Sequence, residues 1–291
     1  MPELAYVNGT FCDLADAKVS IEDRGFQFAD GVYEVVVAFG RRLFCMEEHL
    51  SRLANSLRGI DLDFDPVEHR IEEVVAEGVA RAGFDETMVY LQITRGACSR
   101  GLAVEGPLRP TVVATFKAKP VIDAAVRERG LSVITVPDNR WARCYIKSIA
   151  LLPNALARND ARRRGYDDAI FIGPDGQVRE ATAANVFVVR GGILVTPPKT
   201  DVILHGVTRS CVLECAAQID LPHTESPLTA DDLAAAAELF LSSTTMDFIG
   251  ATRLNDSPIG DGRVGPVTRA LFEQFQKGMA AFRERASSVT S

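Results

Sequence analysis

The stretch Glu180-Ala-Thr-Ala-Ala-Asn185-Val-Phe187 decides the fold, together with two shorter stretches that follow it. Leu194-Val-Thr196 comes next, and Leu204-His-Gly206-Val-Thr208-Arg209 leads into a helix. Small residues around a carboxylate, and a Gly-Val-Thr turn before a helix, suit a phosphorylated heteroaromatic cofactor. The unpaired N–H groups of such a helix start would bind the phosphate. Each stretch alone is weak, because a Gly-Val-Thr turn more often only starts a helix, so the combination has to carry the prediction.

A cofactor with a reactive carbonyl group needs a lysine that can lose its proton near neutral pH. Lys147 lies in Tyr145-Ile-Lys147-Ser-Ile-Ala-Leu-Leu152, among apolar residues between a predicted strand and a predicted helix. Burial there would favour the uncharged amine. The other lysines lie in polar or turn-like settings: Lys18, Lys117, Lys119, Lys199 and Lys277. Composition alone would make Lys147 a solvated surface lysine, and the downstream stretches favour a Schiff-base residue instead.

Length and composition predict a folded protein of two domains. The chain has 291 residues, of which 47% are apolar, enough to bury a core in each domain. The 32 basic and 39 acidic residues form no polybasic run, and no apolar stretch is long enough to span a membrane. We therefore expect neither a nucleic-acid partner nor a membrane partner, and a cytoplasmic location.

The pattern of helices and strands is of the α+β type, with one domain over residues 1–120 and another over 121–291. The boundary is placed at Lys117-Ala-Lys-Pro120, where a proline closes a strand. Apolar runs and alternation predict strands at 4–7, 31–39, 42–45, 88–94, 111–116, 131–136, 169–172, 186–189, 193–196 and 238–242. Apolar residues at helical spacing predict helices at 47–57, 66–82, 152–164, 207–217, 229–237 and 266–285.

Taken together, these motifs resemble the class IV aminotransferases, which are pyridoxal-phosphate (PLP) enzymes of fold type IV. The spacing from Glu180 to Arg209 matches the signature of that family, and Lys147 stands where its Schiff-base lysine is expected. Further stretches look like the bacterial D-amino acid aminotransferase branch: Asp23-Arg-Gly-Phe-Gln-Phe-Ala-Asp30-Gly31-Val-Tyr33-Glu34, Glu48-His49-Leu-Ser-Arg52-Leu53 and Thr94-Arg95-Gly96 with Arg100. The resemblance implies a smaller N-terminal α/β domain and a larger C-terminal domain with a mixed, barrel-like sheet.

The resemblance also implies a role for each candidate residue. Lys147 would form the Schiff base and move the substrate proton, and Glu180 would face the pyridine nitrogen and keep it protonated. Tyr33 and Arg100 would bind the substrate, and Leu204 would pack on the cofactor ring. The phosphate would be bound by Arg52, Val207, Thr208, Ser243 and Thr244. Arg140 and Asp168 would contact these residues and hold them in place, without contacting the cofactor or the substrate.

One departure bears on the substrate. The D-amino acid branch has a histidine two residues after the arginine of its carboxylate trap, and this sequence has Leu102 there, which donates no hydrogen bond. The leading prediction is transfer from a D-amino acid to a 2-oxo acid, 2-oxoglutarate or pyruvate. The alternatives on the same fold are an (R)-selective amine transaminase, a branched-chain aminotransferase and an aminodeoxychorismate lyase. A non-catalytic PLP-binding homologue is the least favoured.

The remaining predictions concern metals, thiols and partners. His49, His69, His205 and His223 lack metal-ligand spacing, so we expect no metal. Six separated cysteines favour reduced thiols. The expected partners are small amino and 2-oxo acids, and the family resemblance implies a homodimer.

Overall fold

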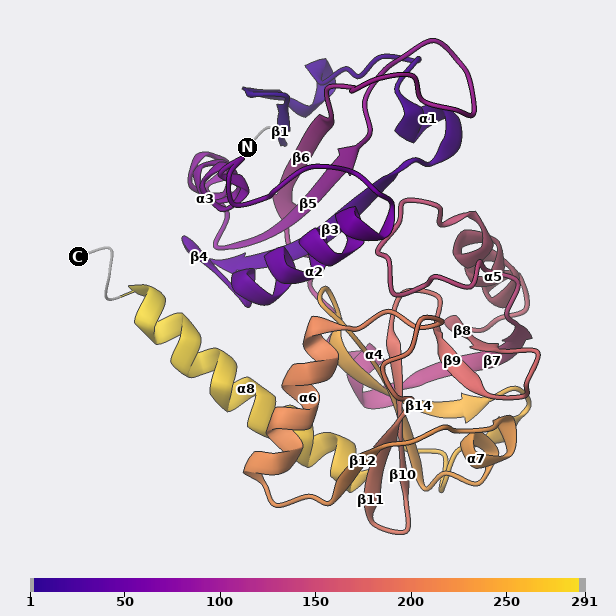
Figure 1. Ribbon diagram of the computed structural model, residues 1–291. Coiled ribbons are helices and arrows are strands. Elements are labelled where there is room, and N and C mark those ends of the chain that lie inside the picture. Colours follow the sequence, from indigo (N-terminus) through magenta and orange to yellow (C-terminus); the bar gives the residue numbers. More distant parts are fainter. Residues whose placement is uncertain (1–2, 288–291) are drawn as a thin grey trace. The chain divides into compact units, whose positions relative to one another are not determined.

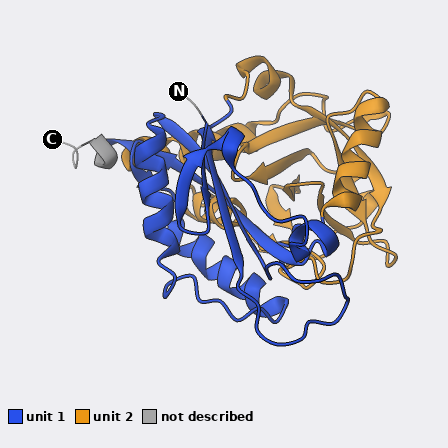
Figure 2. Cartoon of the chain, turned by 90° about the horizontal axis from the view of Figure 1, so that it is seen from above, with its two compact units in different colours: residues 1–120, 146–150, 283–291 blue, residues 121–145, 151–282 orange. Residues whose placement is uncertain are grey.

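The computed structural model describes residues 3–287, and the chain divides into two compact units (Figure 2). The first unit contains the chain up to Pro120, the short segment Ile146–Ala150 and the chain from Arg283 onwards. The second contains Val121–Tyr145 and Leu151–Phe282. The chain therefore returns to the first unit for five residues, and Lys147 lies in that return.

The first unit is built on an antiparallel sheet with strand order β2-β1-β6-β5-β3-β4 (Figure 1). Its strands are β1 (Leu4–Val7), β2 (Thr10–Asp13), β3 (Gly31–Phe39), β4 (Arg42–Leu43), β5 (Glu86–Thr94) and β6 (Thr111–Ala118). Strict alternation in β5 buries Thr87, Val89, Leu91 and Ile93 and leaves the residues between them half-buried. One face of this sheet is therefore apolar and needs a cover.

Two helices cover that face, α2 (Met46–Gly59) and α3 (Ile71–Ala82). Their buried residues recur every three or four positions, so each helix has one apolar side. In α3, Gly78 lies so close to the sheet that a Cβ there would come within 2.0 Å of the Phe116 ring. Two short helices, η1 (Leu14–Asp16) and α1 (Arg24–Phe28), precede β3.

The segment Ile146–Ala150 pairs with the start of β3. Tyr33 N–H donates to the Lys147 carbonyl at 2.9 Å, and Ile149 N–H donates to the Gly31 carbonyl at 3.2 Å. Val32 and Ser148 face each other across an antiparallel bridge. Because backbone bonds define this register, the position of Lys147 along β3 is fixed independently of its side chain.

The second unit is built on a mixed sheet with strand order β12-β11-β10-β13-β14-β7-β8-β9, and β15 pairs with β14. The pairs β14–β7, β7–β8 and β11–β12 are parallel, and the others are antiparallel. Its strands are β7 (Leu131–Pro137), β8 (Asp168–Ile172), β9 (Val178–Ala181), β10 (Asn185–Arg190), β11 (Ile193–Thr196), β12 (His223–Glu225), β13 (Glu238–Ser243), β14 (Asp247–Leu254) and β15 (Ser257–Pro258).

This sheet curls around an apolar core. Strands β9 and β10 lie at separate places in the strand order, yet Val178 of β9 and Val186 of β10 belong to the same buried cluster. Apolar side chains from strands across the sheet share one buried cluster, among them Val133, Ile170 and Leu241. The sheet is therefore a half-barrel, as the family resemblance predicts.

The opposite face of the sheet carries aromatic residues. Phe187 and Phe240 stack across β10 and β13 with ring centroids 4.8 Å apart, and Phe248 packs edge-on against Phe272 of α8 (Pro266–Ser287). The remaining helices of this unit are α4 (Ala124–Arg129), α5 (Leu152–Arg163), α6 (Val207–Gln218) and α7 (Ala230–Ala234). These aromatic contacts bind α8 to the sheet.

The α+β prediction is confirmed, and most predicted helices and strands are present. The helix predicted at 66–82 begins only at Ile71, because residues 66–70 form turns and Arg70 has a positive φ of 52°. The strand predicted at 42–45 ends at Leu43. Several short elements were not predicted, and the largest of them is β14, whose pattern is broken by Gly250.

None of the helices in residues 3–287 is both long enough and apolar enough to cross a membrane.

Gly78→Ala should destabilise the first unit, because the new methyl group must displace the fully buried ring of Phe116. We expect a loss of about 1–3 kcal/mol in the free energy of unfolding. The matched control is Gly278→Ala in α8, where nothing lies within 4 Å of the new methyl group. That change should stabilise the helix by about 0.5–1 kcal/mol. Urea unfolding measures both, and equal effects would contradict the packing argument.

Candidate active site

Lys147 is positioned by the first unit. Its N–H donates to Oγ of Ser56, a buried residue of α2, at 3.0 Å. Its Nζ lies 4.3 Å from the centroid of the Tyr33 ring, over the ring face. The structure thus brings together two of the residues predicted from the sequence, one for the Schiff base and one for the substrate.

Arg52, predicted to bind the phosphate, is buried in an ion pair with Glu34 of β3. Its Nε donates to one carboxylate oxygen at 2.7 Å and its Nη2 to the other at 2.8 Å. His49 lies one helical turn before Arg52, with Nδ1 2.8 Å from the same carboxylate. Two parallel bonds hold a planar guanidinium in one orientation. Glu34 therefore fixes the direction of the Arg52 side chain.

Burial by itself would raise the pKa of Glu34, but the charge and hydrogen bonds of Arg52 and the bond to His49 outweigh it and hold this pKa well below 4.5. For His49, burial lowers the pKa below 6.5, and the charges of Arg52 and Lys147 act in the same direction. At neutral pH the carboxylate is therefore ionised and the imidazole is neutral, so Nδ1–H donates to Glu34.

Arg100 and Leu102 lie together on the connection between β5 and β6. The Arg100 guanidinium carbon is 4.7 Å from the centroid of the Phe28 ring of α1, and the arginine is exposed. Leu102 is 86% exposed. In the structure of this chain, therefore, the leucine that replaces the expected histidine lies on the surface.

Glu180 of β9 is the centre of a polar group in the second unit. One of its carboxylate oxygens accepts from Arg140 Nη1 at 2.6 Å, and the other accepts from the Leu204 N–H at 3.0 Å. Arg140 also binds Asp138 through Nε at 2.9 Å and Nη2 at 3.0 Å. Although burial opposes it, Asp138 and Glu180 raise the pKa of Arg140 above its usual value. A buried guanidinium thus serves two buried carboxylates.

Asn185, at the start of β10, connects Glu180 to the start of α6. Its Nδ2 donates to the Leu204 carbonyl at 2.9 Å and lies 3.5 Å from Glu180. A Cβ at Gly206 would come within 2.0 Å of Asn185 Oδ1, so only glycine fits at the residue before α6. The first two residues of α6, Val207 and Thr208, are buried, and no side chain caps this helix start.

Ser243 and Thr244 come at the end of β13, and Ser242 pairs directly with Asn185 in the sheet. Ser242 is fully buried, and its Oγ has no hydrogen-bond partner among the residues that the structure describes. An unpaired hydroxyl beside an uncapped helix start fits a bound phosphate, which accepts hydrogen bonds from both. Of the predicted phosphate residues of this unit, Val207 and Thr208 begin α6, and Ser243 ends β13, which pairs with β10 next to Asn185.

Two supporting residues were predicted, and they differ in what they contact. Arg140 binds Glu180 directly. Asp168 instead pairs with Arg158 of α5 and accepts a hydrogen bond from the Thr182 hydroxyl at 2.5 Å. Asp168 therefore contacts the loop after Glu180 and not Glu180 itself.

Sequence reasoning gave no role to Glu34, Asp138 or Ser56. A signal for Glu34 was present, because a carboxylate in the apolar run Gly31–Phe39 must be paired if it is buried. Asp138 and Ser56 carry no comparable local signal. Within residues 3–287, no group of three or more His, Cys, Asp or Glu side chains is placed to hold a metal ion.

A two-unit fold with a curled mixed sheet and a lysine bound to the edge of a second sheet defines a class of enzyme, and comparison with known proteins identifies it. The family model described as "Amino-transferase class IV" matches residues 31–254. The chain belongs to the class IV aminotransferase family.

Individual relatives agree over nearly the whole chain. A D-alanine aminotransferase of Bacillus licheniformis is 39% identical and covers 97% of this chain and 98% of its own. A D-alanine aminotransferase of Listeria monocytogenes serotype 1/2a (strain 10403S) is 36% identical, with 92% and 93% covered. Among solved structures, a branched-chain aminotransferase from the thermophilic archaeon Thermoproteus uzoniensis, with norvaline, has a TM-score of 0.82 at 27% identity, with 95% and 94% covered.

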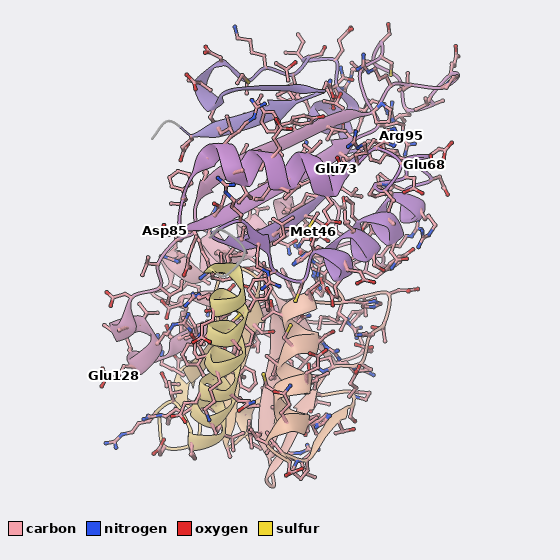
Figure 3. All side chains as sticks on the ribbon, turned by 90° about the vertical axis from the view of Figure 1, so that its left-hand side faces the viewer. Met46, Glu68, Glu73, Asp85, Arg95 and Glu128 are labelled. Atoms are coloured by element: carbon pink, nitrogen blue, oxygen red, sulfur yellow. The ribbon has the colours of Figure 1, made fainter. Side chains whose placement is uncertain are left out.

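Glu34→Gln should lower the free energy of unfolding by about 3–5 kcal/mol at pH 7, because Arg52 would then be buried without a counter-charge. The pKa of Glu34 is depressed in the folded protein, so its contribution is complete above pH 4.5 and is lost as the pH falls below that value. The difference between the two proteins should therefore shrink in acid, as measured by urea unfolding between pH 7 and pH 3. Glu73→Gln is the control, since Glu73 pairs with Arg70 on the exposed surface of α3 (Figure 3). A constant difference across this range would contradict the assignment.

Proposed function

We propose that this protein is a PLP-dependent transaminase that moves the amino group of a D-amino acid to a 2-oxo acid, 2-oxoglutarate or pyruvate. The observation that carries the proposal is Lys147, bound to the edge of β3 with its amine over Tyr33, in a chain of the class IV family. The D-alanine aminotransferases that are 36–39% identical support a D-amino acid as the donor.

When bound, PLP supplies an aldehyde that condenses with an amine and a ring that withdraws electrons from the neighbouring carbon. Lys147 Nζ would be the amine that holds the cofactor, and it would move the proton at the substrate Cα. Glu180, held by Arg140 and the Leu204 N–H, keeps a proton on the ring nitrogen. Leu204 would pack on the ring.

The phosphate is bound by Arg52, by the N–H groups of Val207 and Thr208, and by Ser243 and Thr244. The uncapped start of α6 and the unpaired buried Ser242 hydroxyl support this assignment. Glu34 supports the role of Arg52, since it fixes the direction of the guanidinium. Tyr33 and Arg100 bind the substrate, and Arg100 supplies a guanidinium for the α-carboxylate.

A branched-chain L-amino acid is the second candidate donor. It is favoured by Leu102, which donates no hydrogen bond to a carboxylate, and by the structural similarity to a branched-chain enzyme. Purified protein mixed separately with D-alanine, L-leucine, (R)-1-phenylethylamine and aminodeoxychorismate would decide, because only a true donor changes the absorbance of the bound cofactor rapidly. Conversion by D-alanine supports the proposal, and conversion by one of the others alone overturns it.

The assembly we propose is a homodimer in the cytoplasm. Ile21, Phe26 and Leu102 are three highly exposed apolar residues on two segments that the Asp23–Ala97 bridge places side by side, which suits a contact surface. Six cysteines without a CxxC pair suit a reducing compartment. Light scattering should give about twice the chain mass of 31.6 kDa, and a single chain would contradict the dimer.

Lys147→Ala should lower the transfer rate by at least about 10²–10⁴-fold and remove the absorbance of the Schiff base, because no other residue would replace its amine. Lys277→Ala, on the exposed surface of α8, is the matched control and should change neither property. Unchanged absorbance in the Lys147 variant would refute the assignment.

Gly206→Ala should weaken PLP binding, because its methyl group would displace Asn185, which holds Leu204 and lies at the start of α6. We expect the dissociation constant to rise by at least about tenfold, equivalent to the loss of roughly one charge-assisted hydrogen bond. Equilibrium dialysis measures it, with Gly278→Ala as the control. Wild-type affinity in the Gly206 variant would show that the start of α6 does not contact the phosphate.

A further inference from the structure

Arg24 is a buried arginine of the first unit that has no part in the chemistry described above. Although it begins the short surface helix α1, only 6% of it is exposed. Its Nε donates to Asp30 at 2.8 Å, its Nη1 to the Gly101 carbonyl at 2.7 Å and its Nη2 to the Leu102 carbonyl at 3.2 Å. All three nitrogen atoms of the Arg24 guanidinium thus donate hydrogen bonds. Two of them donate to the connection between β5 and β6, which is distant in the sequence.

That connection joins β5 to β6 and carries Arg100 and Leu102. Its start is held by the backbone, through the Asp23–Ala97 bridge and the bond from Cys98 N–H to the Glu22 carbonyl at 3.3 Å. Beyond that point, the two bonds from Arg24 are the hydrogen bonds that residues 99–108 make within the described part of the chain. One side chain therefore determines where this stretch lies.

Arg24 and Arg100 also share an aromatic ring. The guanidinium carbon of Arg24 lies 4.8 Å from the centroid of Phe28, and that of Arg100 lies 4.7 Å from it. Cation–π contacts of this kind favour a guanidinium over the ring face. Phe28 thus links the buried arginine to the exposed one through direct contacts.

Arg24 shares its carboxylate partner with a second arginine. Asp30 is shared by Arg24 and Arg95, whose Nε atoms both approach the same carboxylate oxygen. Burial would raise the pKa of Asp30, but Arg95 and Arg24 lower it below its usual value, so the carboxylate is ionised. The ionised carboxylate therefore holds the Arg24 guanidinium through a charge-assisted hydrogen bond.

We propose that Arg24 is the positioning residue for carboxylate recognition: it holds residues 99–108 in place and thereby sets the position of Arg100 for an amino-acid substrate. This inference rests on the proposed function, in which Arg100 binds the substrate carboxylate. A purely structural role would instead make Arg24 one of several residues that stabilise the first unit, with no selective effect on substrate binding.

Arg95 provides a matched control, since it binds the same carboxylate but holds a different turn. Its guanidinium donates to the carbonyls of Ile60 and Asp61 at 2.6 and 3.0 Å. Arg24→Gln and Arg95→Gln therefore each remove one arginine from Asp30, and only the first releases residues 99–108. Arg24→Lys keeps the charge but cannot reach two carbonyl groups and Asp30 together.

The first experiment measures steady-state kinetics of the PLP-loaded enzyme with D-alanine. Because misplacing a binding group by about 1 Å can cost up to about 100-fold, we expect KM to rise about tenfold in Arg24→Gln, with kcat within about twofold of wild type. The KM of Arg24→Lys should lie between those of wild type and Arg24→Gln. Phe28→Leu should raise KM about two- to fivefold. Arg95→Gln should leave KM within about twofold.

The second experiment follows hydrogen exchange of the Cys98 backbone amide without substrate, since this N–H donates to the Glu22 carbonyl directly before the stretch that Arg24 holds. Exchange should be faster in Arg24→Gln than in wild type and unchanged in Arg95→Gln. An equal rise of KM in both glutamine variants, unchanged exchange in Arg24→Gln, or a change of KM that accompanies a change of mass in light scattering would overturn the inference. Faster exchange in Arg24→Gln together with no D-alanine activity in wild type would overturn the proposed function while leaving the hold of Arg24 on this stretch intact.

Discussion

A carboxylate inside an apolar strand is the constraint on which the first unit depends. Glu34 lies in β3 between buried valines and is almost wholly inaccessible, so its charge must be compensated inside the protein. Arg52 and His49 of α2 provide that compensation, and they lie three residues apart on one side of the helix. The pair therefore sets the rotation of α2 against the sheet as well as the direction of the guanidinium.

The second unit uses the same device in a different place. Glu180 and Asp138 are both buried, and Arg140 binds both of them. In each unit a rigid guanidinium is oriented by two parallel bonds to a carboxylate, which converts a flexible side chain into a fixed one. A site for a charged cofactor needs this rigidity, because groups that are held in advance need not be ordered again when a ligand binds.

The sequence predicts most of this chain because local signals and motif spacing agree. Apolar periodicity gives the α+β class and the longer helices and strands, and the residues from Glu180 to Arg209 indicate the family. The prediction is wrong at 66–70, where turns precede α3, and it misses β14, in which a glycine interrupts the alternation. Both depend on contacts distant in the sequence, which a local pattern does not contain.

Some residues of the candidate site can likewise be predicted from the local sequence, and others depend on the fold. Lys147 and Glu180 stand out by their surroundings in the sequence, and the structure gives both of them fixed partners. The sequence indicates Arg140 and Asp168 only as supporting residues, because the residue that each of them contacts depends on the fold and not on the local pattern. In the structure, Asp168 forms an ion pair with Arg158 of α5, and Arg140 forms one with Glu180.

The return of Ile146–Ala150 to the first unit has a consequence for how the protein is made. During synthesis all the strands of the first sheet are complete when Pro120 has been added, but the start of β3 still lacks its hydrogen-bonding neighbour. An unpaired strand edge can pair wrongly with another chain. The edge is closed only when the ribosome has added Ala150, so the segment that carries Lys147 is also the one that completes the sheet.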